Sequence, residues 1–120
     1  MRRGEVYWAN ILPRFGSEQK GRRLALVVSH NAFNRIAGWR SVIVVPISTS
    51  TSRARRGPTA VPLPVGAGGL NRPSVALCHQ VTTIDRANLE KRLGLLTPLL
   101  LKEIGLGLRA AMDLEPESAT

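Results

Sequence analysis

The chain has 120 residues, of which 43% are hydrophobic and 21% charged, which is typical of one compact folded domain rather than a disordered chain. Its single cysteine, Cys78, excludes an intramolecular disulfide and a multi-cysteine zinc site. The longest apolar run, 93–101, is interrupted by Gly94 and Pro98 and is too short to span a bilayer. Gly4 follows the two N-terminal arginines where a secretory signal would have an apolar stretch, so we expect a cytoplasmic protein.

Charge is distributed unevenly along the chain. Seventeen Lys and Arg residues against eight Asp and Glu residues give a net charge of +9, and fourteen of the seventeen are Arg. Residues 1–72 hold twelve basic and two acidic side chains, a net +10, whereas residues 73–120 hold five and six, a net −1. Arg is well suited to paired hydrogen bonds with phosphate. The basic part therefore indicates a polyanionic partner, most simply a nucleic acid.

Apolar residues in the first half of the chain recur with a period of two, in short runs separated by turn residues. This pattern predicts strands over 5–11, 24–29 and 41–47. A polar loop is expected over 13–22, and a turn containing one helical turn over 31–38.

The second half continues the β pattern. Cys78 lies in an apolar strand, where we expect it to fill the core, and Asp85 is a candidate helix N-cap. The expected elements in chain order are a polar basic loop over 48–58, a strand over 59–63, a turn over 64–69, a strand over 74–81, a short helix beginning near Asp85, and a strand over 93–96.

A helix is predicted at the C-terminal end. Thr97 is a suitable cap and Pro98 suits the first helical position. Gly105 and Gly107 weaken this helix by about 1 kcal/mol each relative to Ala, so it must depend on packing. The apolar residues at helical spacing are Leu101, Ile104, Leu108 and Met112. Short strands followed by one helix predict a mainly β protein with a small, strongly bent sheet or partly open barrel.

Four segments together resemble one known family. They are RRGEVYWANILP at 2–13, GSEQKGRRL at 16–24, VVPIS at 44–48 and SVALCHQVTTID at 74–85. In order and spacing they are similar to the MazF/PemK family of toxin endoribonucleases. The resemblance extends to about Leu114.

The resemblance implies a single MazF/PemK-like domain over 1–114, followed by a polar tail over 115–120. Its fold would be an SH3-like (CcdB/PemK-type) small barrel of short, mostly antiparallel strands with a C-terminal helix. It would act as a homodimer and be inhibited by a cognate antitoxin, which we expect to be acidic from the charge of residues 1–72.

The resemblance also implies the activity, which is sequence-selective cleavage of single-stranded RNA without a metal or another cofactor. The ribose 2′-hydroxyl attacks the adjacent phosphorus. The products are a 2′,3′-cyclic phosphate, or its hydrolysed 3′-phosphate, and a 5′-hydroxyl.

Three residues are the catalytic candidates. Arg23 follows GSEQ-G, where the family places its main catalytic arginine, and a guanidinium offers fixed donors to a charged phosphate. Ser48 matches the hydroxyl residue that follows Pro-Ile in the family. His79 stands where related sequences often have Asp or Glu, and an imidazole can transfer protons near neutral pH.

Each of these assignments has an alternative. Leu24 stands where the family usually has Pro, which leaves either Arg22 or Arg23 as the key arginine. Ser48 begins a hydroxyl-rich stretch, so Thr49 is a second candidate for the phosphate contact. His79, taken alone, is equally consistent with a strand histidine that bonds a neighbour.

The RNA-binding candidates lie mainly in two polar loops. Glu18 and Gln19 can read base edges, and Phe15 beside them is a better stacking candidate than Trp8, which we expect in the core. Arginines in the 48–58 loop can follow a phosphate backbone, although solvated surface charge is the alternative. The complete predicted set is Phe15, Glu18, Gln19, Arg22, Thr49, Arg53, Arg55, Arg56 and Gln80.

Two other functions are consistent with the same sequence. One is a non-catalytic toxin of this fold that binds a protein target such as gyrase. The other is an RNA-binding protein that does not cleave its ligand. The arginine after GSEQ-G and the basic loop favour the nuclease, because a protein-binding barrel needs neither.

Overall fold

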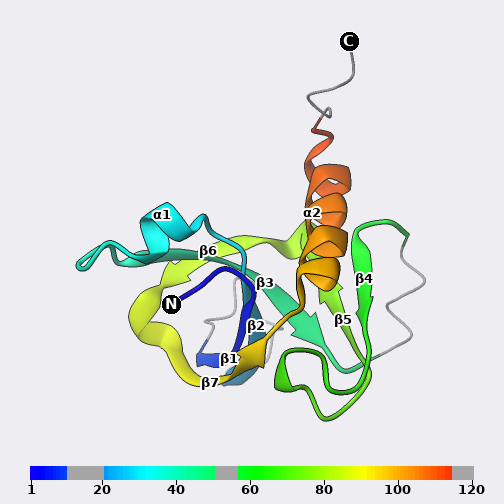
Figure 1. Cartoon of the computed structure of the whole chain (residues 1–120), viewed down its shortest axis with the longest axis horizontal. Helices are drawn as coiled ribbons and strands as arrows, with labels where there is room; N and C mark the ends of the chain where they lie inside the picture. The colour runs from blue at the N-terminus through cyan, green and yellow to red at the C-terminus, as the bar shows by residue number, and fades with distance from the viewer. Residues whose placement is uncertain (11–20, 51–56, 115–120) are drawn as a thin grey trace.

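The structure is a computed structural model, and it describes residues 1–10, 21–50 and 57–114. A strongly curved antiparallel sheet of seven strands carries one long helix across one of its ends (Figure 1). The strands are β1 (Glu5–Asn10), β2 (Arg22–Val27), β3 (Ser41–Ser48), β4 (Ala60–Leu63), β5 (Ser74–Leu77), β6 (Thr82–Asp85) and β7 (Leu89–Leu95). The helices are α1 (Asn31–Asn34) and α2 (Pro98–Met112), with short 3-10 turns η2 (Ala67–Gly69), η3 (Cys78–Gln80) and η4 (Arg86–Asn88).

Strand β3 is the organising strand of the sheet. The hydrogen-bonded order is β4-β5-β3-β2-β1-β7, and β6 also pairs with β3. The first half of β3 pairs with β6, at Ser41 to Val44, and its end pairs with β5, at Ile47 and Ser48. The sheet bends into a barrel-like shape that is not closed. This arrangement confirms the predicted fold class of short antiparallel strands with a C-terminal helix.

The two largest of the three apolar clusters that the described residues form lie on opposite faces of the sheet, and the third is a small one of Ala60, Val75 and Leu77. The cluster beneath α2 includes Leu26, Leu63, Leu96 and Ile104, all at most 2% exposed. The other cluster lies on the opposite face and consists of Ala9, Ala25, Val27, Val42 and Val44. Alternating side chains of β1, β2 and β3 therefore enter different cores, as the period-two pattern predicts.

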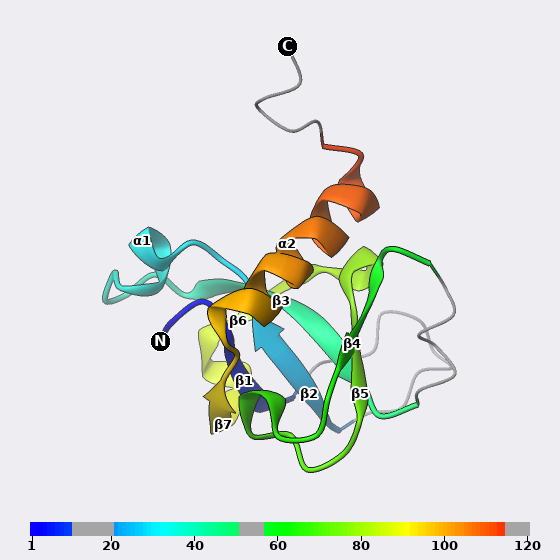
Figure 2. The same cartoon turned by 45° about the vertical axis from the view of Figure 1, so that its right-hand side comes forward.

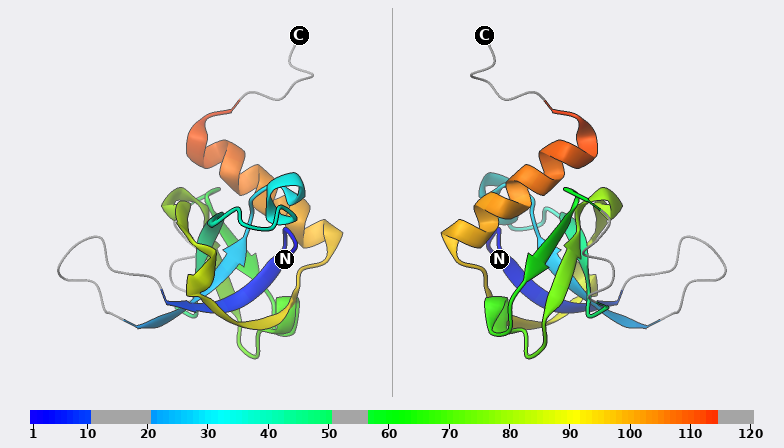
Figure 3. Two further views of the ribbon diagram at one scale, coloured as in Figure 1. Left: turned by 90° about the vertical axis from the view of Figure 1, so that its left-hand side faces the viewer. Right: turned by 90° about the vertical axis from the view of Figure 1, so that its right-hand side faces the viewer.

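Helix α2 is capped at both ends, by Thr97 and Asp113. The Thr97 hydroxyl accepts a hydrogen bond from the Leu100 N–H at 3.2 Å, and Pro98 occupies the first turn as predicted. Asp113 ends the helix in the left-handed conformation, with φ of 53°. Figures 2 and 3 show α2 lying across the open end of the sheet beside η3, with its outer side uncovered. Among the residues described, no helix is long and apolar enough to cross a membrane.

The predicted strand over 74–81 is wrong in its second half. Strand β5 ends at Leu77, η3 follows, and a separate strand β6 that the sequence analysis missed begins at Thr82. The turn is needed because β5 pairs with the end of β3, whereas β6 pairs with its beginning. Cys78, the first residue of η3, is completely buried, in agreement with its predicted place in the core.

Other boundaries also differ from the prediction. Strand β2 begins at Arg22, which the sequence analysis placed in a loop, because Arg22 pairs with Asn10 of β1. Strand β7 begins at Leu89 rather than residue 93, because its first residues pair with β1. Asp85 caps a short helical turn as predicted: its Oδ1 accepts a hydrogen bond from the Ala87 N–H at 2.9 Å.

Candidate active site

Arg23 and Ser48 lie on neighbouring strands at the same edge of the sheet. Strands β2 and β3 pair through Leu24 and Ile47, and Arg23 and Ser48 are each the next residue outward from that pair. Cross-strand neighbours have Cβ atoms about 5 Å apart. By strand alternation both side chains lie on the face that carries Ala25 and Val44. We call this place the Arg23–Ser48 edge.

The Ser48 hydroxyl is oriented by its own backbone. Its Oγ accepts a hydrogen bond from the Ser50 N–H at 3.1 Å, and the side chain is half-buried. Because the oxygen is the acceptor in this hydrogen bond, the hydroxyl hydrogen is available for donation outward. A hydroxyl held in this way can donate to an anionic oxygen beside Arg23.

Arg22 occupies a different environment from Arg23. Its Nε lies 3.2 Å from Glu90 Oε1, and its guanidinium carbon lies 5.3 Å from the centre of the Trp8 ring. These contacts bind Arg22 to β7 and β1, on the opposite face from Arg23 and Ser48. The geometry thus favours Arg23 as the partner of Ser48 and leaves Arg22 as a neighbouring cation.

A cleft of about 330 Å³ opens on that opposite face, directly behind the Arg23–Ser48 edge. Thr49, the residue after Ser48, lines it. Its apolar wall consists of Trp8, Leu24, Leu70 and Leu93, and its polar rim consists of Thr49, Asn71 and Arg72. We call it the edge cleft. A half-buried indole together with one cation and an amide at the rim provides both stacking and hydrogen-bonding surfaces.

Asn71 and Arg72 were missed by the sequence analysis. They follow the Gly-rich turn that was predicted only as a connection, and they reach the site because Val75 of β5 pairs with Ser48. In that turn Gly69 has a φ of +80°, and a Cβ added there would lie 2.3 Å from the Leu93 carbonyl oxygen. The sequence signal was the pair of one polar and one basic residue that follows the glycines after Leu70, but the position of this pair depends on a long-range strand pairing.

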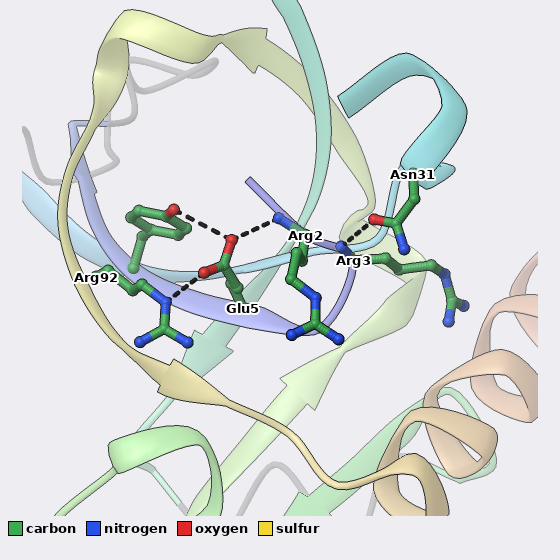
Figure 4. Close-up of polar contacts among 6 residues, drawn as sticks. Arg2, Arg3, Glu5, Asn31 and Arg92 are labelled. Carbon is green, nitrogen blue, oxygen red and sulfur yellow. Dashed lines mark hydrogen bonds and ion pairs between the residues drawn. The ribbon is translucent and has the colours of Figure 1, made fainter. Parts of the chain in front are cut away.

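A buried carboxylate network joins β1 to β7, the strands that supply two walls of the edge cleft. Glu5 is 5% exposed; it accepts hydrogen bonds from the Arg2 N–H and the Tyr7 hydroxyl and forms an ion pair with Arg92 (Figure 4). Burial raises the pKa of Glu5, but hydrogen bonds from Arg92 and Arg2, with the Arg92 charge, outweigh burial and lower this pKa overall. Burial and the neighbouring Glu5 raise the pKa of Tyr7.

His79 and Gln80 lie elsewhere. Both are exposed on η3, which packs against α2 (Figure 2). Strand β5 runs antiparallel to β3, so the chain moves away from Ser48 after Val75 and reaches η3 toward the other end of β3. The structure therefore brings Arg23, Ser48 and Thr49 together but does not place His79 or Gln80 with them. His79 lies on the turn η3, whereas its alternative role assumed a position on a strand.

Six predicted RNA contacts fall outside the described residues: Phe15, Glu18, Gln19, Arg53, Arg55 and Arg56. The first three belong to the segment that joins Asn10 to Gly21, and the arginines follow Ser50. In the part of the chain that the structure describes, no group of three or more His, Cys, Asp or Glu side chains could hold a metal ion. Burial raises the pKa of the Cys78 thiol to about 11, so this residue is not a nucleophile at neutral pH.

Comparison with known proteins places the chain in one family. The family model described as "PemK-like, MazF-like toxin of type II toxin-antitoxin system" matches residues 2–112. The chain belongs to the PemK/MazF toxin family. Endoribonuclease MazF6 of Mycobacterium tuberculosis (strain ATCC 25618 / H37Rv) is 31% identical over 112 residues, which cover 93% of this chain and 96% of that protein. Endoribonuclease EndoA of Bacillus subtilis is 32% identical over 114 residues, covering 95% and 96%.

Solved structures of the PemK/MazF family share the fold. The Mycobacterium tuberculosis toxin MazF-mt6 superimposes with a TM-score of 0.74 at 26% identity, covering 93% of this chain and 99% of that one. A mycobacterial endoribonuclease in complex with its cognate antitoxin gives a TM-score of 0.75 at 28% identity, covering 95% and 96%. These matches confirm the family and the fold that the resemblance implied.

Proposed function

We propose that this protein is a sequence-selective endoribonuclease that cleaves single-stranded RNA and acts as the toxin of a type II toxin–antitoxin pair. Its relatives are named endoribonucleases, and the observation that carries the proposal for this chain is the pairing of Arg23 with Ser48 at the sheet edge. These two side chains supply donors to one phosphate, and the edge cleft behind them supplies a surface for a base.

The reaction follows from what these donors can stabilise. The ribose 2′-hydroxyl attacks the adjacent phosphorus, and negative charge accumulates on the non-bridging oxygens of the phosphorane. Arg23 donates to these oxygens through its planar guanidinium, and Ser48 donates its hydroxyl hydrogen. The 2′-oxygen gives up its proton as it bonds to phosphorus, and the 5′-oxygen takes up a proton as its own bond to phosphorus breaks. The products are a cyclic 2′,3′-phosphate, or after hydrolysis a 3′-phosphate, and a 5′-hydroxyl. The donor set needs no metal ion for this charge stabilisation.

RNA binding is proposed to continue from this edge on both sides. The edge cleft receives a base beside the cleaved phosphate, with Trp8 in the apolar wall and Thr49, Asn71 and Arg72 at the rim. The segments outside the described residues contribute further contacts through Phe15, Glu18, Gln19, Arg53, Arg55 and Arg56, and Gln80 remains a predicted contact.

His79 remains a separate prediction for proton transfer. Its exposed position on η3 separates it from the Arg23–Ser48 pair within this chain. The pH dependence of the cleavage rate tests this prediction. Loss of the rate change near neutral pH in His79→Gln supports proton transfer by His79, and an unchanged pH–rate profile contradicts it.

The proposed partners follow from the family and the charge. We propose that the protein is a cytoplasmic homodimer inhibited by an acidic antitoxin, because residues 1–72 carry a net charge of +10. A relative of the same fold is described in complex with its cognate antitoxin. An acidic segment across the Arg23–Ser48 edge would place carboxylates where RNA phosphates bind, and RNA and antitoxin would then compete.

The test is incubation of purified protein with an end-labelled RNA of mixed sequence in the presence of EDTA. Discrete fragments from the wild type, formed about tenfold or more slowly by Arg23→Ala, support the nuclease. Binding without fragments would indicate an RNA-binding protein, and neither binding nor fragments would favour a toxin directed at a protein.

A further inference from the structure

A second surface feature lies on the outer side of α2. It is a groove of about 440 Å³ between α2 and the N-terminal segment, which we call the α2 groove. Its lining residues are Arg3, Pro98, Leu101, Lys102, Leu106 and Arg109, with Gly105 at its floor. The α2 residues recur at intervals of three and four, so they form one helix face. Ile104 and Gly107, which face the core, are not among them.

The α2 groove is distant from the Arg23–Ser48 edge. Arg3 donates a hydrogen bond from Nε to the Val28 carbonyl at 3.1 Å, beyond the end of β2. Val28 is five residues along the chain from Arg23, or roughly 16 Å at about 3.3 Å per residue. A ligand in the groove therefore does not occupy the catalytic edge.

The floor of the groove is open and aliphatic. A Cβ added at Gly105 would meet no atom within 4 Å, so this glycine leaves unfilled space. Leu106 beside it is 49% exposed. None of the described residues that line the groove is aromatic, so they offer no stacking surface to a base. These properties suit aliphatic side chains of a protein segment better than RNA.

Three cations border this floor without carboxylate partners. Among the described residues neither Lys102 nor Arg109 forms an ion pair, and no acidic side chain lines the groove. The Arg3 backbone N–H donates to Asn31 Oδ1 at 2.7 Å, and its side chain extends toward α2 (Figure 4). The N-terminal segment thus holds one cation opposite the two on the helix.

Charge decides which occupant the groove favours. A symmetric contact between two copies would bring the same three cations from each protomer together, which is electrostatically unfavourable. A segment with carboxylates on one side and aliphatic residues on the other would satisfy both the cations and the floor.

We propose that the α2 groove binds an acidic, amphipathic segment of the antitoxin and anchors it at a place separate from the RNA site. The proposal relies on the proposed function only for the identity of this partner. An anchored antitoxin would keep the remainder of its acidic chain close to the Arg23–Ser48 edge, which raises its effective concentration there.

The experiment uses the full-length toxin and the antitoxin encoded beside it. Gly105→Leu fills the groove, and Lys102→Glu reverses one of its cations. Ala110→Leu and Arg35→Glu introduce the same side chains at exposed positions outside the groove. Antitoxin affinity is measured by calorimetry, oligomeric state by sedimentation, and RNA cleavage by the labelled-RNA assay.

We expect each groove variant to weaken antitoxin binding by about tenfold or more, as loss of a central interface contact does, while both controls bind like wild type. RNA cleavage and oligomeric state should not change. Wild-type affinity in both groove variants would overturn the proposal, as would a changed oligomeric state, which would identify a second copy as the occupant. Impaired cleavage would identify RNA as the occupant and would also overturn it. If the wild type bound antitoxin in this manner but cleaved no RNA, only the proposed function would fail.

Discussion

Arg23 and Ser48 lie opposite each other on β2 and β3, one residue beyond the paired Leu24 and Ile47. The sheet register thus makes the two residues cross-strand neighbours, whose Cβ atoms lie about 5 Å apart. The adjoining residues Leu24 and Ile47 are 8% and 7% exposed, so the backbone that carries both side chains is anchored in the core. Precise placement of donors is what stabilisation of a phosphorane requires.

Arg23→Ala and Ser48→Ala should each lower the rate of RNA cleavage by about tenfold or more, because each removes a donor to the transition state. RNA binding should change much less than the rate. The measurement is a single-turnover cleavage rate at saturating RNA. Arg35→Ala, which removes an exposed arginine elsewhere, is the control. Comparable rates for Arg23→Ala and wild type would show that Arg23 has no catalytic role.

Arg72→Ala tests the edge cleft. Arg72 lines its rim but is not adjacent to Ser48 in the sheet, so we expect weaker RNA binding with a nearly unchanged rate at saturation. Loss of one phosphate contact should also reduce the slope of log affinity against log salt by about one. Fluorescence anisotropy over a salt series measures both quantities. An identical slope in Arg72→Ala and wild type would exclude a phosphate contact by this residue.

Local sequence pattern was sufficient for much of the fold. The strands at β1, β3 and β4 were predicted within one residue at each end, and α2 was predicted with its cap. These elements carry their signals in their own residues, such as alternation or Thr97-Pro98. Strand β6 was missed because the apolar run over 74–81 does not reveal that the chain turns at η3 to reach the other half of β3.

The candidate site, like the fold, could be predicted from local sequence only in part. Arg23 and Ser48 are marked by motifs in the sequence, but their position beside each other depends on the register of β2 and β3. Asn71 and Arg72 carry no motif and reach the edge cleft only through the pairing of β5 with β3. The separation of His79 from Ser48 is likewise a consequence of strand direction, which the sequence analysis did not resolve.

Gly105 and Gly107 should respond oppositely to the same substitution. Gly105→Ala should raise the free energy of unfolding by up to about 1 kcal/mol, because its Cβ meets no neighbour and Ala favours a helix. A Cβ at Gly107 would lie 2.8 Å from Cys78 Sγ and Val61 Cγ2. Gly107→Ala should therefore lower the free energy of unfolding by about 1–3 kcal/mol. Urea denaturation measures both, and a change of the same sign in both variants would contradict the packing of α2.

Glu5 should make stability depend on pH. The pKa of Glu5 is lower in the folded protein than in the unfolded chain, so its contribution is complete above the unfolded pKa. That contribution is lost as pH falls through the folded pKa. Glu5→Gln should therefore be less stable than wild type by about 1–3 kcal/mol at pH 7, and the difference should shrink below about pH 4.

Denaturation at a series of pH values measures this difference. Glu103→Gln, which neutralises an exposed carboxylate on α2, is the control and should differ little from wild type at any pH. A difference between Glu5→Gln and wild type that stays constant from pH 7 to pH 3 would show that Glu5 contributes through packing rather than through its charge.

The most direct test of the proposed chemistry uses one RNA substrate in two forms. A cleaved oligonucleotide is compared with the same strand carrying a single deoxyribose in place of the ribose whose 2′-hydroxyl attacks, both in EDTA. We expect the all-ribose strand to yield a 5′-hydroxyl fragment and a cyclic phosphate or 3′-phosphate end, and the substituted strand to remain intact at that position. Efficient cleavage of the substituted strand at the same bond would contradict the mechanism assigned to Arg23 and Ser48.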